Sequence, residues 1–415
     1  MNIGVFFGSR SPEHDVSIIT GELIISELKK LGHSVVPVYL DKNGRWFVSE
    51  ELGTLKFFTS GPARRSLHGE GGEVEKWENY GKIYLDIESS KGKMVFRKKG
   101  FGGKEYAIDL AFPAFHGRNG EDGTIQGLFE IFNVPYVGCD VASSAITMDK
   151  VLTKLLCERF GIPTADFVYF ESGEWDTQKS QLLAHAEKKL GWPMFVKPAR
   201  LGSSIGIAKA GSTKLTTSKN RKELEFAIEV ALKYDDKVLV EKAVENLADI
   251  TCCVIGLPAQ AGGENPKASL IQEAVFGSDM FSYEDKYLED GGAQLGNAKQ
   301  KLVIPADIGA ELTEEIRLLS VEIFKKFGCS GIARVDFLLD RKSGQYYVSE
   351  INTLPGTLYH HLWKASGLEI GDLIKELIKT AEERHKKKKR LINSFESDLL
   401  KFANSIKLNM KNDGS

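Results

Sequence analysis

The sequence predicts an α/β protein built from more than one packed unit. A short apolar run at residues 2–7 is followed by apolar residues at helical spacing over 16–32 and by a second apolar run at 34–40. This strand–helix–strand order is typical of an α/β layer. The chain has 415 residues, more than one hydrophobic core usually serves. We therefore expect two or three packed units.

Composition and charge exclude several classes of protein. The formal net charge is −2, so no global field attracts nucleic acid or anionic lipid. The N-terminus lacks a basic region followed by a long apolar core, and no apolar run approaches the ~20 residues of a membrane span. Five cysteines without a CxxC spacing favour a reducing compartment. We expect a cytoplasmic protein with small-molecule partners, no nucleic acid and no membrane contact.

Further elements follow the opening unit along the chain. Residues 42–106 read as an insertion of hairpins. Strands are expected at 106–117, 134–138, 193–198, 206–210, 237–244 and 249–256. Helices are expected at 123–133, 148–160, 224–234 and 311–328. A helical apolar stripe after the basic run at 385–390 predicts a docked or frayed terminal helix rather than a targeting signal; its members are Leu391, Ile392, Phe395, Leu399, Phe402 and Ile406.

Two β-rich runs near the C-terminus, ARVDFLL and QYYVSEI, carry a set of polar side chains at even spacing. Side chains at i and i+2 share one face of a strand. A symmetric hairpin therefore pairs Asp336 with Glu350 and Arg334 with Asn352. Such hard oxygen ligands suit Mg²⁺, which binds through one or two carboxylates together with substrate phosphates. The alternative is a solvent-facing sheet in which Arg334 alone neutralises both acids.

Two further segments are suited to binding phosphate. FVKPARLGSSIGIAK places two glycines and two hydroxyls between strands, where backbone N–H groups can cradle phosphate oxygens, and Lys197 adds a point charge. Lys150 lies in the first turn of a predicted helix, where the helix dipole disfavours a cation unless an anion is near. Neither segment is a Walker A loop or a GxGxxG motif. A plain hairpin and a surface lysine are the alternative interpretations.

These segments occur with others in a recognisable order: GSRSPEHDVS, FHGRNGEDGTIQG, PYVG, TMDKVLTK, GIPT, FVKPARLGSSIGIAK, VLVEK, DKY, GIARVDFLL and EINTLPG. In this order they resemble the ATP-grasp enzymes, and more narrowly the D-alanine–D-alanine ligase family with its depsipeptide-forming relatives. The resemblance runs from the first strand to about Ile378.

The resemblance implies a fold and a reaction. The fold would be a three-domain ATP-grasp α/β fold, with a Rossmann-like N-terminal domain (1–142), two α+β domains enclosing ATP (143–236 and 237–385), a mobile loop at about 276–300, and a basic, helical tail (386–415). ATP with two Mg²⁺ ions, or Mn²⁺, would phosphorylate the carboxylate of a first D-alanine, and the amine of a second would displace phosphate. The dipeptide would serve peptidoglycan synthesis. A homodimer is also implied.

The resemblance also implies roles for single residues. Arg334 would face the acyl phosphate, where charge develops, and the N–H of Gly356 would be a second donor. Glu13, Ser203 and Tyr287 would form a hydrogen-bonded set that closes the active-site loop. The implied ATP-binding residues are Lys150, Lys197, Ser203, Ser204, Glu241, Lys242, Val244, Asp249 and Lys286. The implied metal ligands are Asp336, Glu350 and Asn352. The first substrate would lie near His116, with its ammonium on Glu13.

The chain departs from the family pattern in two places. The ribose-binding acid is usually a glutamate after a short turn; here Asp249 stands one residue later, with Glu245 as a rival. The loop after NTLPG is a few residues shorter and lacks the usual serine that helps to hold the second substrate. His360 or His361 would replace it, and we assign His361 and Leu362 to this substrate. D-lactate, D-serine or another amine is therefore the alternative second substrate.

Two alternatives come from other classes. A nucleotide-binding protein that has lost catalysis conflicts with the intact polar set on the hairpin. A dinucleotide oxidoreductase would rest on the opening strand–helix–strand unit, which lacks GxGxxG.

Overall fold

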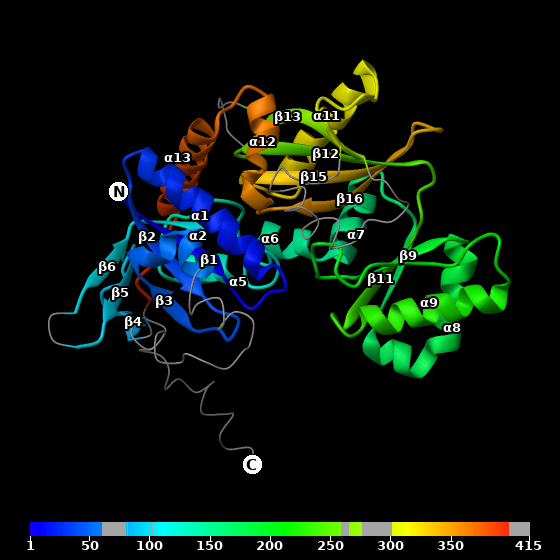
Figure 1. Ribbon diagram of the computed structural model, residues 1–415, viewed down its shortest axis with the longest axis horizontal. Helices are drawn as coiled ribbons and strands as arrows, with labels where there is room; N and C mark the ends of the chain where they lie inside the picture. Colours follow the sequence, from blue (N-terminus) through cyan, green and yellow to red (C-terminus); the bar gives the residue numbers. More distant parts are fainter. Residues whose placement is uncertain (60–79, 81, 101–102, 259–264, 276–300, 398–415) are drawn as a thin grey trace, which may run out of the picture.

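The structure, a computed structural model, arranges the chain around four β-sheets in three groups of elements (Figure 1). The N-terminal group is blue to cyan, a mostly green group carries α8 and α9, and the third group runs from green through yellow to orange. The described chain comprises all residues except 60–79, 81, 101–102, 259–264, 276–300 and 398–415.

The N-terminal sheet has the strand order β3-β2-β1-β7. β1 (Asn2–Gly8), β2 (Ser34–Leu40) and β7 (Leu110–Pro113) are parallel, and β3 (Trp46–Val48) adds an antiparallel edge. α1 (His14–Lys30) connects β1 to β2 and buries its apolar side chains against the sheet. The predicted opening strand–helix–strand unit is confirmed.

A small antiparallel meander lies beside this sheet. It consists of β4 (Ile83–Leu85), β5 (Met94–Lys98) and β6 (Glu105–Ile108), so the described part of the predicted insertion does contain hairpins. The single strand expected over 106–117 is wrong, because β6 and β7 belong to different sheets. The chain divides at Asp109, whose backbone and carboxylate both bond to the backbone of Asn2 at the start of β1.

Three short helices lead from the first group to the rest of the chain: α5 (Thr124–Ile131), α6 (Val141–Met148) and α7 (Lys150–Phe160). The helix expected over 148–160 starts at Lys150 and follows another helix that the sequence did not indicate. Asp149 separates them, since its carboxylate accepts hydrogen bonds from the first free N–H groups of α7. Gly161 ends α7 in a left-handed conformation, as predicted.

The second group is a four-stranded antiparallel sheet of order β10-β9-β11-β8 with two helices. Its elements are β8 (Phe167–Glu171), α8 (Ser172–Leu190), β9 (Met194–Pro198), β10 (Ala208–Ala210), α9 (Thr217–Ala231) and β11 (Lys237–Lys242). α8 was not predicted. Its few buried side chains, among them Trp175 and Leu183, pack with those of α9 in one core under the sheet.

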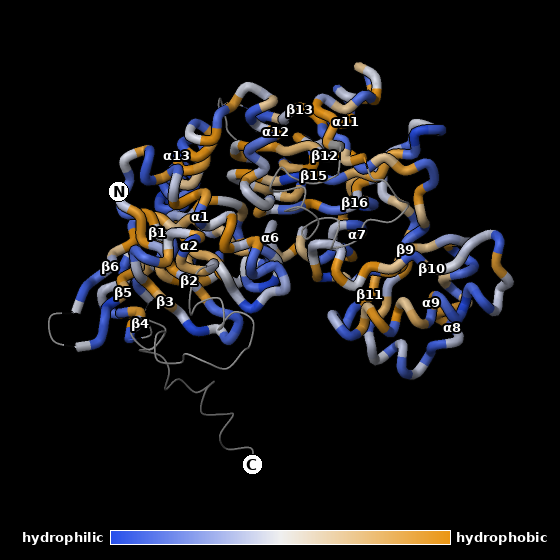
Figure 2. The backbone as a smooth tube through the Cα atoms, viewed as in Figure 1, coloured by the Kyte–Doolittle hydropathy of each residue, from blue (hydrophilic) through white to orange (hydrophobic). Residues whose placement is uncertain are grey.

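The third group is a five-stranded antiparallel sheet of order β14-β13-β12-β15-β16. Its strands are β12 (Leu247–Gly256), β13 (Lys267–Val275), β14 (Lys301–Val303), β15 (Gly331–Asp340) and β16 (Tyr346–Asn352). Its helices are α11 (Ala310–Lys326), α12 (His360–Ala365) and α13 (Ile370–Lys389). Short helical turns lie at Glu50–Gly53, Leu55–Thr59 and Gly356–Tyr359. In Figure 2 the apolar colours gather on the strands and the polar colours on outer loops.

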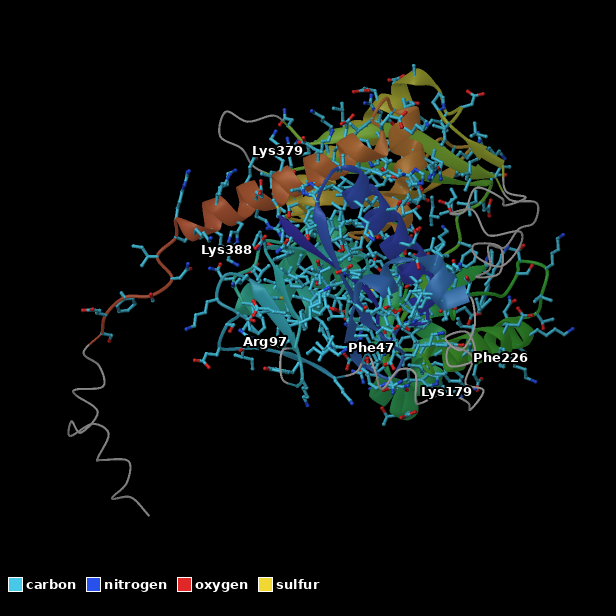
Figure 3. All side chains as sticks on the ribbon, turned by 60° about the vertical axis from the view of Figure 1, so that its left-hand side comes forward. Phe47, Arg97, Lys179, Phe226, Lys379 and Lys388 are labelled. Atoms are coloured by element: carbon cyan, nitrogen blue, oxygen red, sulfur yellow. The ribbon has the colours of Figure 1, made fainter. Side chains whose placement is uncertain are left out.

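The C-terminal segment leaves the folded body after α13, on which Figure 3 labels Lys379 and Lys388. Residues 391–397 are not helical, so the predicted terminal helix is wrong for this stretch. Leu391, Ile392 and Phe395 are 64%, 88% and 82% exposed, and a helix gains little there without packing. The remainder of the predicted stripe lies outside the described residues. Within the described chain, no helix is long and apolar enough to cross a bilayer.

Candidate active site

The polar hairpin forms with the predicted register. β15 and β16 are antiparallel, Arg334 pairs with Asn352, and Asp336 pairs with Glu350. A bulge follows directly after Asp336, so the symmetric pairing ends there. The four polar side chains therefore share one face of the sheet, and that prediction is confirmed.

Two neighbouring strands extend this polar row. Thr251 on β12 pairs with Asp336, and Gln272 on β13 pairs with Thr251. A row of four polar residues thus crosses β13, β12, β15 and β16. The Thr251 hydroxyl donates to Oδ1 of Asp336 at 2.8 Å. Sequence reasoning missed both residues, although Thr251 stands two positions after Asp249 in a β-rich run and must share its face.

Arg334 is buried and held chiefly by Asp336. Its Nε lies 2.9 Å and 3.0 Å from the two carboxylate oxygens of Asp336, and its Nη2 lies 2.6 Å from Oδ2. Nη2 also lies 3.5 Å from Oε1 of Glu350. Bidentate pairing of this kind fixes the plane of a guanidinium as well as its position.

Lys150 connects α7 to the hairpin. Its Nζ lies 3.3 Å from Oε2 of Glu350 and donates to the carbonyl of Leu201 at 2.7 Å. Its backbone N–H donates to Ala199 at 2.9 Å, at the start of the glycine-bearing turn. The predicted phosphate lysine, the turn and the carboxylate hairpin therefore meet at one place, as a shared site for phosphate and metal requires.

Lys197 on β9 belongs to a second, buried ion cluster. Its ammonium contacts one oxygen of Glu241 on β11, and Nζ of Lys154 lies 3.0 Å from the other. Lys154 also donates to Thr164 at 2.9 Å. Burial alone would raise the pKa of Glu241, but the two lysines outweigh it and lower that pKa to about 2. We call Lys154, Glu241 and Lys197 the lysine triad; sequence reasoning had assigned no role to Lys154.

Glu13 joins the first loop of the N-terminal group to the glycine-bearing turn. The Ser203 hydroxyl donates to its Oε1, as the resemblance implied for this pair. A Cβ atom on Gly117 or on Gly202 would come within 3 Å of Oε2 of Glu13, so a side chain at either position would displace this carboxylate. Ser203 and Ser204 have positive φ angles of 54° and 59°. Non-glycine residues in this conformation cost energy and cluster at functional sites.

His116 and Glu121 are fully enclosed beside this loop. Burial, with the nearby Arg334, lowers the pKa of His116 to about 4, and its Nε2 lies 2.8 Å from the Thr20 hydroxyl. Burial, with the nearby carboxylate of Glu13, raises the pKa of Glu121 to about 8. Its Oε2 accepts from the N–H of Gly117 at 2.6 Å. Both side chains are therefore mainly uncharged near pH 7. Glu121 was not singled out from the sequence.

The turn after NTLPG has an unusual backbone. Thr357, Leu358 and Tyr359 have φ angles of 49°, 55° and 50°, three left-handed residues in succession without a glycine. Each costs roughly 1 kcal/mol or more. The N–H of Thr357 donates to the Thr20 hydroxyl of α1 at 3.1 Å. Gly356, the predicted second donor to the acyl phosphate, opens this turn.

The two histidines that follow are poorly suited to bind a carboxylate by charge. Nε2 of His361 lies 2.6 Å from the side-chain amide oxygen Oε1 of Gln272, and burial lowers the pKa of His361 to about 4. Burial also lowers the pKa of His360. The side chain of Leu362 is fully buried in the core, so only its backbone can face a ligand.

The remaining predicted ATP residues lie on or near β11 and β12. Asp249 shares the sheet face of Thr251 and Asp336, which favours it as the ribose acid over the exposed Glu245 before the strand. Lys242 is exposed and Val244 is partly buried. Both are compatible with a segment that binds adenine through its backbone groups. Lys286, Tyr287 and the predicted mobile loop 276–300 lie outside the described residues.

The carboxylates of the hairpin fit Mg²⁺ bound jointly with phosphate. Asp336 and Glu350 face each other, and Asn352 adds an amide oxygen that accepts one hydrogen bond, from Leu354 at 3.1 Å, and keeps a lone pair. In the described part of the chain, no three acidic, histidine or cysteine side chains gather as a metal centre. Mg²⁺ needs no such cage, because substrate phosphates and water complete its shell.

Comparisons with known proteins agree with this arrangement. Residues 2–139 match the family model for the D-ala D-ala ligase N-terminus, and residues 156–379 match that for its C-terminus. The chain is 39% identical over 402 residues to a D-alanine--D-alanine ligase of Thermosipho melanesiensis, covering 97% of this chain and 98% of the relative. It is 37% identical over 387 residues to that of Clostridium acetobutylicum, covering 92% and 98%.

Solved structures give the same result. The D-alanine-D-alanine ligase from Coxiella burnetii superposes with a TM-score of 0.71 at 28% identity, covering 94% of this chain and 96% of that one. The VanG D-Ala:D-Ser ligase from Enterococcus faecalis gives 0.69 at 28% identity, covering 92% and 99%. Fold and family define an ATP-dependent carboxylate–amine ligase with the ATP-grasp fold. More narrowly, the chain belongs to the D-alanine–D-alanine ligase family.

Proposed function

We propose that this enzyme joins two molecules of D-alanine, with ATP as the energy source, to supply the dipeptide for peptidoglycan. The observation that carries the proposal is the meeting of Lys150 from α7 with Glu350 from the hairpin that holds Arg334 and Asp336. A lysine for phosphate, two carboxylates for a metal and a buried guanidinium then surround one point, as phosphoryl transfer to a carboxylate requires.

The first step transfers the γ-phosphoryl group of ATP to the carboxylate of the first D-alanine. An oxygen of that carboxylate forms the new P–O bond, and ADP leaves. Lys150 and Lys197 hold phosphate oxygens, while the carboxylate of Glu13, bonded to Ser203, holds the substrate ammonium. Asp336, Glu350 and Asn352 would hold Mg²⁺ as one or two ions, or Mn²⁺, which would neutralise phosphate charge.

The second step forms the peptide bond. The neutral amine of the second D-alanine attacks the acyl carbon, the C–O bond to phosphate breaks, and inorganic phosphate leaves while the nitrogen releases a proton. Negative charge develops on the carbonyl oxygen, close to Arg334 and to the backbone of Gly356. A guanidinium already fixed by Asp336 stabilises that charge without reorganising.

A panel of second substrates tests the proposal. Purified protein is supplied with ATP, Mg²⁺ and D-alanine, alone or with D-lactate, D-serine or other amines, and phosphate release and product mass are measured. D-alanine alone should support turnover and give D-alanyl-D-alanine. No turnover with D-alanine alone would contradict the proposal.

A different second substrate is the second candidate function. The observation that favours it is the short turn after Gly356, where the described histidines are uncharged near pH 7. The similar VanG enzyme is named as a D-Ala:D-Ser ligase. Turnover only in the presence of D-serine, D-lactate or another amine would establish this function instead.

Replacing Arg334 by alanine tests the role of the guanidinium. Arg334→Ala should lower kcat by about 1,000-fold, because it removes the cation closest to the developing charge. The Kd for ATP, measured by calorimetry without D-alanine, should change by less than about threefold. Unchanged turnover would refute the role.

We further propose a cytoplasmic homodimer, which sedimentation and cell fractionation would test.

A further inference from the structure

The Arg334 guanidinium is restrained on one edge and on one face. Asp336 occupies the edge formed by Nε and Nη2. Tyr359, from the turn after Gly356, places its ring over the guanidinium, with Cζ 4.9 Å from the ring centroid. Among the described residues, none accepts a hydrogen bond from Nη1 on the second edge of the guanidinium. Stacking on an aromatic face and bidentate pairing are the two contacts that best fix a guanidinium plane.

The edge contact is not independent of the ligands. Asp336 is also a proposed metal ligand, and its Oδ1 is shared with the Thr251 hydroxyl. A metal bound to Asp336 would compete with Arg334 for the same carboxylate oxygens. The ring contact involves no atom that a metal or a phosphate would claim. The aromatic face is therefore the restraint on Arg334 that persists when ligands bind.

The backbone that carries Tyr359 is unusual in a way that serves this contact. Thr357, Leu358 and Tyr359 are all left-handed, and this turn brings the ring back over β15. Glycine would adopt these angles at no steric cost, yet none of the three is glycine. A strained backbone conformation in a functional site indicates a function when neighbouring residues hold the backbone in that conformation.

The neighbours of the turn do enforce it. The Thr20 hydroxyl accepts from the N–H of Thr357 at 3.1 Å, which fixes the start of the turn to α1. The His361 ring packs against the Tyr359 ring in a tilted arrangement, with centroids 4.8 Å apart. Nε2 of His361 is in turn fixed to Gln272 on β13 at 2.6 Å. Tyr359 thus contacts both a restrained imidazole and the guanidinium.

We propose that Tyr359 is a positioning residue of the ligase reaction: its ring, held by the left-handed turn and by His361, keeps the Arg334 guanidinium aimed at the reacting acyl group. This rests on the proposed function for the identity of that group. The proposal also assigns His361 a structural role: it supports Tyr359 and does not pair by charge with the second substrate.

The test compares an aromatic and a non-aromatic replacement. Tyr359→Phe keeps the ring and loses the hydroxyl; Tyr359→Leu loses the ring but has the same type of β-carbon, so its left-handed backbone is equally strained. Tyr359→Phe should keep kcat within about threefold of wild type. Tyr359→Leu should lower kcat by at least about tenfold, with the Kd for ATP within about threefold. Tyr359→Met replaces the leucine variant if that variant does not fold.

Two outcomes would overturn the proposal. One is wild-type kcat in Tyr359→Leu; the other is an equal loss in Tyr359→Phe, which would assign the effect to the hydroxyl. Kinetics use D-alanine, or the panel member that wild type turns over fastest, so a failure of wild type with D-alanine rejects the proposed function alone.

A thermal double-mutant cycle tests the contact without any substrate. The Tm of Arg334→Met, Tyr359→Leu and the double variant should be non-additive, with a smaller drop from the second change than from the first. Additive drops in Tm would show that the two side chains are not coupled, and would also overturn the proposal.

Discussion

Two buried glutamates of the site differ in charge near pH 7: one is ionised and the other is mainly neutral. Glu241, in the lysine triad, has a pKa lowered to about 2, and Glu121, beside the first loop, has a pKa raised to about 8. Burial favours the neutral acid at both places. The difference comes from the neighbours: two lysines around Glu241, and the carboxylate of Glu13 beside Glu121.

The charge balance of each region suits the ligand expected there. The triad has two lysines and one carboxylate, so it keeps one positive charge inside the protein, where polyphosphate is expected. Glu121, by contrast, is mainly protonated near pH 7 and lies beside Glu13, the residue proposed to hold the substrate ammonium. Local partners, rather than burial, therefore decide which of these two glutamates is ionised near pH 7.

The largest expected effect is on stability, from removing the more deeply buried lysine. The side chain of Lys154 is 1% exposed and that of Lys197 is 10% exposed. Lys154→Met should lower the free energy of unfolding by about 2–3 kcal/mol, because Glu241 loses one of its two buried cationic partners. Lys197→Met should cost less stability but raise the Kd for ATP by at least about tenfold, since Lys197 is the proposed phosphate ligand.

Urea unfolding and calorimetry with ATP separate these two lysines. Lys188→Met, at an exposed position of α8, is the control and should match wild type in both measurements. If Lys154→Met were as stable as wild type, the triad would contribute nothing to the fold, and the contrast with Glu121 would lose its physical basis.

The second prediction concerns Glu121 and the dependence of stability on pH. The unfolded chain releases this proton near its ordinary pKa of 4.5, whereas the folded protein keeps it up to about 8. The unfolded state therefore binds fewer protons between these values, and the free energy of unfolding falls as pH rises. Glu121→Gln has no such proton to release. The difference in free energy of unfolding between the variant and wild type should therefore shift by ~2 kcal/mol in favour of the variant from pH 5 to pH 7.

Urea unfolding at pH 5, 6 and 7 measures that difference. Contributions of groups that do not interact with Glu121 are common to both proteins and cancel. Glu88→Gln, at an exposed acid of the meander, should follow the wild-type slope. The same slope in Glu121→Gln and wild type would mean that Glu121 is ionised in the folded protein.

Local patterns in the sequence were enough to predict the hairpin. Strand alternation and the length of the turn fix which side chains share a face, and the pairs at Arg334 and Asp336 follow. Contacts between distant segments required more. That Ser203 bonds to Glu13 was expected only through the family resemblance, because no local rule relates an N-terminal loop to a turn between later strands.

The residues and the helix that the sequence analysis did not predict were missed for physical reasons. Lys154 stands four positions after Lys150, on the same face of α7, so its direction was readable, but its partner Glu241 lies on a distant strand. Thr251 and Gln272 enter the site through the pairing of β12 and β13, which one strand does not reveal. Among the elements, α8 carries few buried residues, so its apolar signal is weak.

The smallest expected effect is on the acid side and would sharpen the contrast between the two glutamates. The folded pKa of Glu241 lies below its unfolded value, so its stabilising contribution is present above about pH 4.5 and is lost as pH falls toward 2. In the double variant Lys154→Met/Glu241→Gln, one charge of each sign is removed and the net charge of the triad is unchanged. Between pH 4 and pH 3 wild type should lose ~1 kcal/mol more than the double variant in urea unfolding.

The same double variant separates charge balance from direct contact. Because Lys197 remains, its Kd for ATP should rise less than that of Lys197→Met, even though two of the three triad members are gone. Equal weakening in both variants would show that the pairing within the triad, and not its single surplus positive charge, prepares the site for phosphate. Equal acid slopes in wild type and the double variant would show that Glu241 is not held ionised by the lysines.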